Sequence, residues 1–262
     1  MFKALVIFSF LLWEARGEIN NDLDPRVVGG EDAAEGSAPF IASLRRIRHV
    51  QGRTETMHFC GGTILTQKWI LSAAHCTYRV PAHSIQVRVG TNKRTSGGNS
   101  YDVVSIVIHE NYTANTSKND ISLLKIFGSI KFDTNIQPIK LPTSNIGPGV
   151  MCKLTGWGKI DSQAVPENLQ VVYNIITISV EECNRRLANV TEKFLPIIDK
   201  QLCTITKEGK GSGQGDSGGP LISDGVQVGI VSWGVPCAQG RPDVLTRVYS
   251  YVKWINNYIS NE

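Results

Sequence analysis

The sequence predicts an all-β protein, and three observations support this class. Short apolar runs recur along the 262 residues, and Ile85–Val89 alternates apolar and polar side chains as a half-buried strand does. Clusters of Gly, Pro, Asn and Ser, such as residues 91–100, separate the runs. Only the end has helical spacing, because the apolar residues from Val248 to Ile259 follow at intervals of four, three and four. This pattern favours antiparallel β-barrels or sandwiches followed by one helix.

The other strands are predicted from apolar runs between turn residues. They are residues 59–65, 103–108, 121–126, 151–157, 169–178 and 226–233. Composition agrees with a globular chain, since 41% of residues are hydrophobic and 19% are charged.

The N-terminus predicts export. A basic start at Lys3 precedes an apolar run over residues 4–13, which is short for a membrane span, and small residues follow at Ala15 and Gly17. Residues 1–17 are therefore predicted to be a signal peptide, with a buried N-terminal helix as the alternative. No later run approaches transmembrane length, so a secreted, extracellular protein without a membrane partner is expected.

Residues 18–26 form a polar segment that ends in Pro25 and Arg26. Proline disfavours helix in the residue before it, so this segment is interpreted as an exposed, cleavable linker. The main domain then comprises residues 27–262.

Six cysteines in an exported chain indicate disulfides rather than metal or redox chemistry. Three Asn-X-Ser/Thr sequons, at Asn111, Asn115 and Asn189, predict a glycoprotein.

The net charge is +4, and the densest basic stretch contains Arg45, Arg46, Arg48 and Arg53. It is interpreted as a solvated strand face, with contact to an acidic partner as the alternative. No nucleic-acid motif accompanies it, so no nucleic-acid partner is expected.

Three residues are candidates for nucleophilic catalysis. Ser217 lies in Gly-Asp-Ser-Gly-Gly-Pro, where glycines permit a sharp turn that exposes the hydroxyl and directs N–H groups to one point. A serine hydroxyl needs a nearby base, and His75 follows an apolar strand. Asp120 begins another apolar strand, and such a buried acid needs a partner like the imidazole N–H. The alternatives are a glycine-rich turn, a structural histidine and a turn-forming aspartate.

Together these residues resemble the chymotrypsin–trypsin family of serine proteases, and within it the insect chymotrypsin-like enzymes. The resemblance covers residues 27–262. Its motifs lie at residues 27–30, 58–62, 71–76, 154–158, 215–220 and 231–234.

The resemblance implies two perpendicular antiparallel β-barrels with a C-terminal helix and the active site between the barrels. It implies a serine endopeptidase that hydrolyses peptide bonds through an acyl-enzyme and needs no cofactor. Ser217 is then the nucleophile, with His75 and Asp120 as its catalytic partners. The N–H groups of Gly215 and Ser217 form the oxyanion hole.

The resemblance also implies a zymogen. A trypsin-like protease would cut after Arg26, and the new ammonium group of Val27 would pair with Asp216. Protein or peptide substrates, this activating protease and protein inhibitors are the implied partners of a monomer.

The implied disulfides are Cys60–Cys76 and Cys183–Cys203. Two cysteines remain, because the family's usual partner of Cys152 is replaced by Ser223 and that of Cys237 by Gly213. Even-number pairing would join Cys152 to Cys237, but the family fold places them far apart. Both are therefore expected to be unpaired.

The implied specificity pocket differs from that of trypsins, whose aspartate six residues before the nucleophile is replaced here by Gly211. This change favours an aromatic or leucine side chain. Asp243 lies on the opposite pocket wall and would add Lys and Arg, unless it turns outward. The remaining substrate-contacting residues are Ser212, Gln214, Ser232, Trp233 and Gly234. The acids that hold calcium in some relatives are missing from residues 90–101, so no metal is expected.

Two other functions remain as alternatives. One is a catalytically silent homologue that acts as a binding protein, but this chain keeps Ser217 and His75. The other is a non-proteolytic esterase with a Gly-X-Ser-X-Gly motif between strand and helix, which would require an α/β chain.

Overall fold

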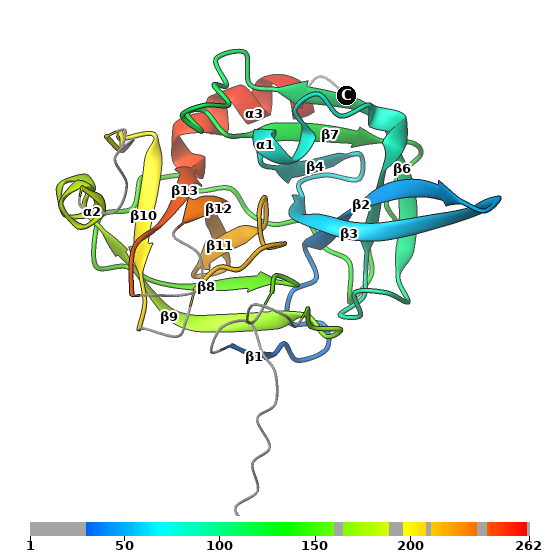
Figure 1. The fold of residues 1–262 in the computed structure, drawn as a ribbon, viewed down its shortest axis with the longest axis horizontal. Coiled ribbons are helices and arrows are strands. Elements are labelled where there is room, and N and C mark those ends of the chain that lie inside the picture. Colours follow the sequence, from blue (N-terminus) through cyan, green and yellow to red (C-terminus); the bar gives the residue numbers. More distant parts are fainter. Residues whose placement is uncertain (1–29, 160–164, 189–195, 208–210, 235–239, 261–262) are drawn as a thin grey trace, which may run out of the picture.

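The computed structural model describes residues 30–159, 165–188, 196–207, 211–234 and 240–260. These residues form two closed antiparallel β-barrels beside each other (Figure 1). The predicted class, two antiparallel barrels with a C-terminal helix, is confirmed. No helix in this described part of the chain has the length and apolar character needed to span a bilayer.

The first barrel closes in the strand order β2-β3-β4-β7-β6-β5. Its strands are β2 (Ile41–Val50), β3 (Arg53–Ile64), β4 (Trp69–Ser72), β5 (Ile85–Val89), β6 (Asn99–Ile108) and β7 (Ser122–Ile126). In β5 the alternation predicted from the sequence is realised, because Ile85, Val87 and Val89 are buried. The one-turn helix α1 (Ala74–Thr77) follows β4, and a 3₁₀ turn (Ala82–Ser84) precedes β5.

The second barrel has the order β9-β10-β13-β12-β11-β8 and closes because β8 also pairs with β9. Its strands are β8 (Met151–Gly156), β9 (Gln170–Ile178), β10 (Gln201–Ile205), β11 (Pro220–Ser223), β12 (Val226–Gly234) and β13 (Asp243–Arg247). The short strand β1 (Glu31–Asp32) pairs with the first two residues of β9.

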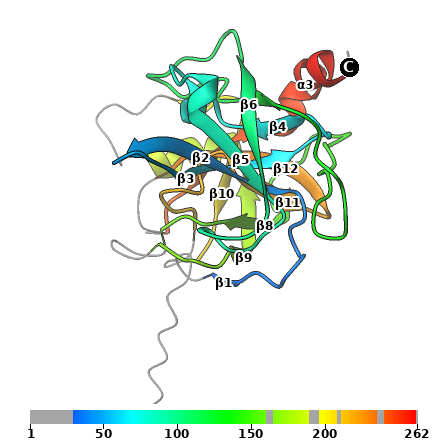
Figure 2. The same ribbon diagram turned by 90° about the vertical axis from the view of Figure 1, so that its right-hand side faces the viewer.

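The C-terminal helix joins the two barrels. A 3₁₀ turn (Val248–Tyr251) and α3 (Val252–Ile259) continue from the last strand of the second barrel. Tyr251 and Ile255 are buried in a hydrophobic cluster formed largely by the first barrel, and the Tyr251 ring meets the His109 ring edge-on at 5.3 Å. Figure 2, which views the first barrel from its outer side, shows α3 beside these strands.

The expectation that only the C-terminus is helical is wrong, because α2 (Val180–Leu187) leads from β9 towards β10. The Ser179 hydroxyl caps this helix by accepting the N–H of Glu182 at 3.1 Å. Serine followed three residues later by glutamate is a helix-start signal. This signal was available in the sequence.

The two predicted disulfides are present. Cys60–Cys76 joins β3 to α1, and Cys183–Cys203 joins α2 to β10. Cys152 is buried and unpaired, and burial raises the pKa of its thiol to about 11. Cys237 lies outside the described residues, so its pairing stays a prediction.

Candidate active site

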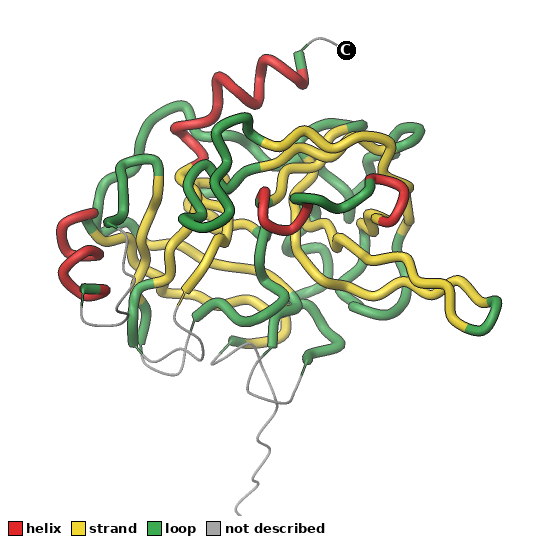
Figure 3. The backbone as a smooth tube through the Cα atoms, turned by 45° about the horizontal axis from the view of Figure 1, so that its top comes forward, coloured by secondary structure: helices red, strands yellow, loops and turns green. Residues whose placement is uncertain are grey.

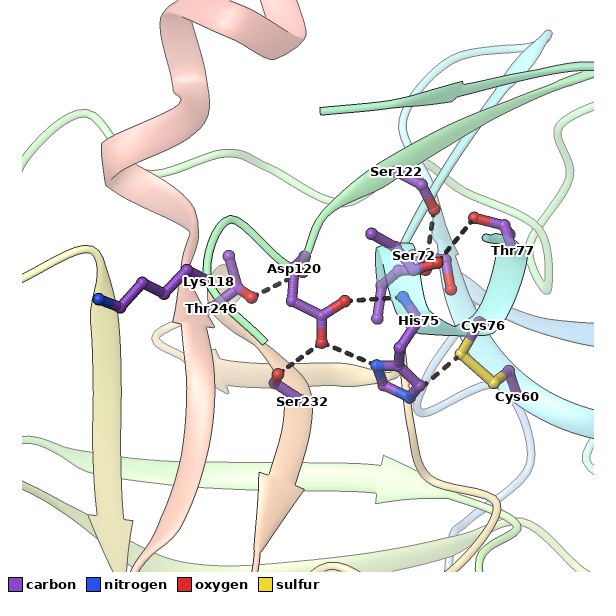
Figure 4. Close-up of polar contacts among 12 residues, drawn as sticks. Cys60, Ser72, His75, Cys76, Thr77, Lys118, Asp120, Ser122, Ser232 and Thr246 are labelled. Atoms are coloured by element: carbon purple, nitrogen blue, oxygen red, sulfur yellow. Dashed lines mark hydrogen bonds and ion pairs between the residues drawn. A yellow bond between two sulfur atoms is a disulfide. The ribbon is translucent and has the colours of Figure 1, made fainter. Parts of the chain in front are cut away.

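His75 and Asp120 form a doubly hydrogen-bonded pair (Figure 4). His75 lies on α1, and Asp120 lies two residues before β7. The imidazole Nδ1 is 2.7 Å from Asp120 Oδ2, and the His75 main-chain N–H donates to Oδ1 at 2.8 Å. An ionised carboxylate only accepts, so Nδ1 carries the hydrogen and Nε2 keeps a free lone pair. The pair is thus arranged to accept a proton at Nε2.

Asp120 is fully buried, and the second barrel supplies further donors to it. The Ser232 hydroxyl donates to Oδ2 at 2.5 Å, and the Thr246 hydroxyl donates to the Asp120 carbonyl at 2.7 Å. Tyr251 donates to Asn119 Oδ1 at 3.0 Å. The sequence assigned Ser232 only to substrate contact. Its bond to Asp120 was missed because nothing local indicates contact across 112 residues.

The Ser217 segment packs against the segment that leads to His75. The Gly61 N–H donates to the Ser217 carbonyl at 2.8 Å, and the Gly218 N–H donates to the Val231 carbonyl at 2.9 Å. Gly218 has φ +78, and a Cβ there would overlap the Ser72 hydroxyl and the Gly61 carbonyl. Glycine is therefore required for the two barrels to meet at the serine.

Ser217 itself is partly exposed. Within the described residues no hydrogen bond joins its hydroxyl to His75, whose Nε2 lies 3.6 Å from Cys76 Sγ. Bonds between nucleophile and base are often long without substrate and shorten in the complex. The residue after the serine, Gly218, lies close to Ser72 and Ala73, which precede His75 by three and two residues.

Two main-chain N–H groups of the Ser217 turn were predicted to bind the oxyanion. Considering only the described residues, neither the Gly215 nor the Ser217 N–H has an acceptor. Gly215 has φ +108, a conformation that favours glycine. Its carbonyl accepts His58 Nε2–H at 3.1 Å, and the Ser43 hydroxyl donates to His58 Nδ1 at 2.8 Å. His58 thus fixes this turn.

Burial lowers the pKa of His58 to about 4, so the ring is neutral at pH 7. Residues 58–62 were recognised as a motif, but no role was predicted for the histidine within it. The position of His58, just before a glycine-rich strand end, was the available signal.

Asp216 is fully buried and bound by main-chain groups. Its Oδ1 accepts the Gly158 N–H at 2.7 Å, and its Oδ2 accepts the Gly213 N–H at 2.8 Å. Burial raises the pKa of this carboxyl to about 6. Arg26 and Val27 lie outside the described residues, so the predicted activation pair stays a prediction.

The Asp243 carboxylate faces two predicted pocket segments. Its Oδ2 accepts the Ser212 N–H at 3.1 Å, and a Cβ on Gly234 would overlap its Oδ1. Burial raises the pKa of Asp243. Trp233 is partly buried beside Gly234.

The other predicted site residues lie as follows. Gln214 is exposed, and its carbonyl accepts the Lys159 N–H at 2.7 Å. Asn111 and Asn115 are exposed, as glycosylation requires. Asn189 lies outside the described residues.

Two closed barrels that bring a buried aspartate–histidine pair to a glycine-framed serine define a class of protein, the serine endopeptidases. A family model described as Trypsin matches residues 27–255. The chain belongs to this family, and its substrates are proteins.

Relatives of this chain are named as chymotrypsins and as trypsins. The chain is 40% identical to Chymotrypsin-2 of Vespa crabro over 231 residues, which cover 87% of this chain and 98% of the relative. It is 37% identical to Trypsin Blo t 3 of Blomia tropicalis, with 97% of each chain covered. It is 35% identical to Trypsin I-P1 of Gallus gallus, with 99% of each covered.

Proposed function

We propose that this chain is the secreted precursor of a serine endopeptidase that is activated by cleavage after Arg26. The observation that carries the proposal is the buried Asp120, which fixes His75 by two hydrogen bonds. The N–H groups of Gly215 and Ser217, which have no acceptor among the described residues, support it.

In the proposed reaction the Ser217 oxygen attacks the peptide carbonyl carbon while His75 Nε2 takes the hydroxyl proton. Asp120 stabilises the resulting imidazolium. The carbonyl oxygen becomes an oxyanion, and the N–H groups of Gly215 and Ser217 donate to it. The intermediate collapses to an acyl-enzyme, and His75 gives its proton to the departing amine. Water, deprotonated by His75, attacks the acyl-enzyme by the same steps and releases the acid and Ser217.

Activation depends on Asp216 in this proposal. Residues 1–17 are removed on export, and cleavage after Arg26 frees the ammonium group of Val27. That cation supplies the opposite charge for a buried carboxylate that otherwise has only two N–H partners in the described part of the chain. Because Asp216 precedes the nucleophile, the pair orders the oxyanion N–H groups.

The specificity pocket is proposed to accept two kinds of side chain. Gly211 leaves room for Phe, Tyr or Leu, and Asp243 attracts Lys or Arg when ionised. The hydrogen bond from Ser212 directs Asp243 towards the pocket segments, and the relatives' names include both chymotrypsin and trypsin. Ser232, Trp233 and Gly234 pair with the substrate backbone, and Gln214 lines the entrance.

The remaining parts of the proposal concern the environment. The enzyme is a monomer, a trypsin-like protease cuts after Arg26, and protein inhibitors are further partners. Asn111 and Asn115 carry glycans.

A covalent serine-hydrolase probe tests the function. The purified chain should react only after cleavage at Arg26, and the Arg26→Gln precursor should be folded, unreactive and inactive. Ser217→Ala should fold, show no labelling and lose on the order of 10⁶-fold in kcat. Labelling of the cleaved Ser217→Ala protein would contradict the assigned nucleophile. An unreactive, correctly cleaved wild type would instead favour a silent binding protein.

A further inference from the structure

The hairpin of β2 and β3 projects from the first barrel (Figures 1 and 3). Strand β5 pairs with β2 only as far as Arg46. Beyond it β2 and β3 pair only with each other, from Ile47 opposite Thr56 to Val50 opposite Arg53. A ribbon that leaves its sheet in this way exposes both faces.

One face of the ribbon is basic. Cross-strand partners lie on the same face and successive residues alternate, so the register assigns six side chains to this face. They are Arg46, Arg48, Val50, Arg53, Glu55 and Met57. It therefore has three guanidinium groups and one carboxylate.

Two apolar side chains on this face, Val50 and Met57, are each 45% exposed. The Arg46 guanidinium lies 4.7 Å from the centre of the Phe59 ring. Phe59 is the extra residue of a bulge between the pairs Leu44–Cys60 and Arg45–His58. Apolar and cationic groups therefore share this face of the ribbon.

Arg48 and Arg53 are exposed, whereas Arg46 is half-buried and donates to the Ser84 hydroxyl at 3.4 Å. Among the described residues no carboxylate lies within ion-pair distance of Arg46, Arg48 or Arg53. Arg45, on the other face, is different: it is buried and donates to Thr56 Oγ1, to the Thr56 carbonyl and to the Arg94 carbonyl. Arg45 thus holds the hairpin in place, whereas the three arginines of the basic face are exposed or half-buried.

The hairpin begins at the candidate active site. His58, which holds the Gly215 carbonyl, and Gly61, which holds the Ser217 carbonyl, both lie on β3. At about 3.3 Å per strand residue, Arg53 lies roughly 17 Å from His58. The segment proposed to pair with the substrate backbone, Ser232–Gly234, lies on the second barrel. A substrate whose residues before the cleaved bond pair with this segment extends its residues after that bond towards the first barrel, where the hairpin begins.

We propose that this basic face binds acidic residues of the protein substrate, roughly two to six positions after the cleaved bond. The inference rests on the proposed function and adds a substrate class to it. Carboxylates meet the arginines, and neighbouring apolar side chains meet Val50 and Met57. This mixture fits an acidic peptide better than a sulfated polysaccharide, which offers no apolar side chains.

The test uses quenched fluorescent peptides with identical residues before the cleaved bond and either Glu or Ser at positions three to six after it. We expect kcat/KM to be about tenfold higher for the Glu peptides at low salt and the advantage to shrink as salt rises. Arg48→Ser with Arg53→Ser should remove most of this advantage, whereas Lys131→Ser with Lys253→Ser, two exposed lysines elsewhere, should keep it. Arg48→Glu with Arg53→Glu should reverse it in favour of Lys peptides.

A nitroanilide substrate, which has no residues after the cleaved bond, separates the two proposals. All hairpin variants should hydrolyse it like the wild type. If the cleaved wild type does not hydrolyse it, the proposed function fails, and binding of a Glu peptide to Ser217→Ala protein still tests the hairpin. Equal kcat/KM for Glu and Ser peptides overturns the inference. Heparin binding that needs Arg48 and Arg53, without any gain for Glu peptides, assigns the face to polysaccharides and also overturns it.

Discussion

The two barrels contribute to the site in different ways. The first barrel supplies His75 and Asp120, which are joined by a side-chain hydrogen bond. The Cys60–Cys76 disulfide anchors α1, the helix that carries His75. The second barrel supplies Ser217 on a loop whose geometry depends on main-chain N–H groups bound to buried carboxylates.

In the second barrel two carboxylates, those of Asp243 and Asp216, accept the N–H groups of two adjacent residues. Ser212 N–H donates to Asp243, and Gly213 N–H donates to Asp216. Charge at Asp243 also raises the pKa of Asp216, after the larger effect of burial. We therefore expect the geometry of the Ser217 loop to respond to protonation and to a bound cation. The His75–Asp120 pair should respond less, because hydrogen bonds and a disulfide fix it.

The sharpest test of this difference is Asp216→Asn in the cleaved enzyme. The amide keeps the size of the side chain but cannot pair with the Val27 ammonium, so the oxyanion N–H groups lose their support. We expect kcat to fall about 10³-fold, as for loss of an oxyanion donor. The hydrogen-exchange protection of the first barrel should change little. Steady-state kinetics measures the first effect, and hydrogen exchange measures the second. A variant with wild-type kcat would show that the oxyanion N–H groups are in place without the pair between Asp216 and Val27.

The uncleaved precursor adds a pH dependence. The pKa of Asp216 is raised to about 6, above its unfolded value, so the folded precursor binds more protons than the unfolded chain between about pH 4 and 6. Its stability should fall as pH rises through this range, which denaturant unfolding of the Arg26→Gln protein measures. The Asp216→Asn form of that precursor should lose this slope.

Asp243→Asn tests the other carboxylate that binds the Ser217 loop, the one proposed to lie in the specificity pocket. The amide can still accept the Ser212 N–H but carries no charge, so cleavage after Lys should fall about 100-fold relative to cleavage after Phe. Because burial raises the pKa of Asp243, the wild-type preference for Lys should increase as pH rises through its titration. The ratio of kcat/KM for matched Lys and Phe peptides gives both answers. Asp224→Asn, at an exposed turn, should leave the ratio unchanged.

The smallest effect is expected where the barrels share a hydrogen bond. Ser232→Ala removes one donor from Asp120 but leaves both bonds to His75. We expect kcat to fall about tenfold, as for one hydrogen bond to a charged group. Ser122→Ala, which removes a hydroxyl bonded to the Ala73 carbonyl, is the matched control and should cost less. Equal losses would argue that neither serine acts through the catalytic aspartate.

Sequence patterns predicted β5 because its side chains alternate in burial, but they predicted no strand for residues 41–50, where β2 begins with five consecutive buried residues. The candidate triad was predicted from short motifs whose residues are local in sequence. Contacts that join the barrels were not predictable this way: Ser232 reaches Asp120, and His58 reaches Gly215, across more than a hundred residues. The helix α2 was missed although its capping serine precedes a glutamate by three residues.

The contacts of Asp120 also bear on when the candidate active site can fold during synthesis. Its carboxylate and carbonyl receive hydroxyl groups from Ser232 and Thr246, which the ribosome adds more than a hundred residues later. A nascent chain that ends before them would have to bury this acid with fewer donors. The Asp120–His75 pair therefore gains all of its hydrogen bonds only when nearly the whole polypeptide has been made, so this part of the precursor completes its folding late in synthesis.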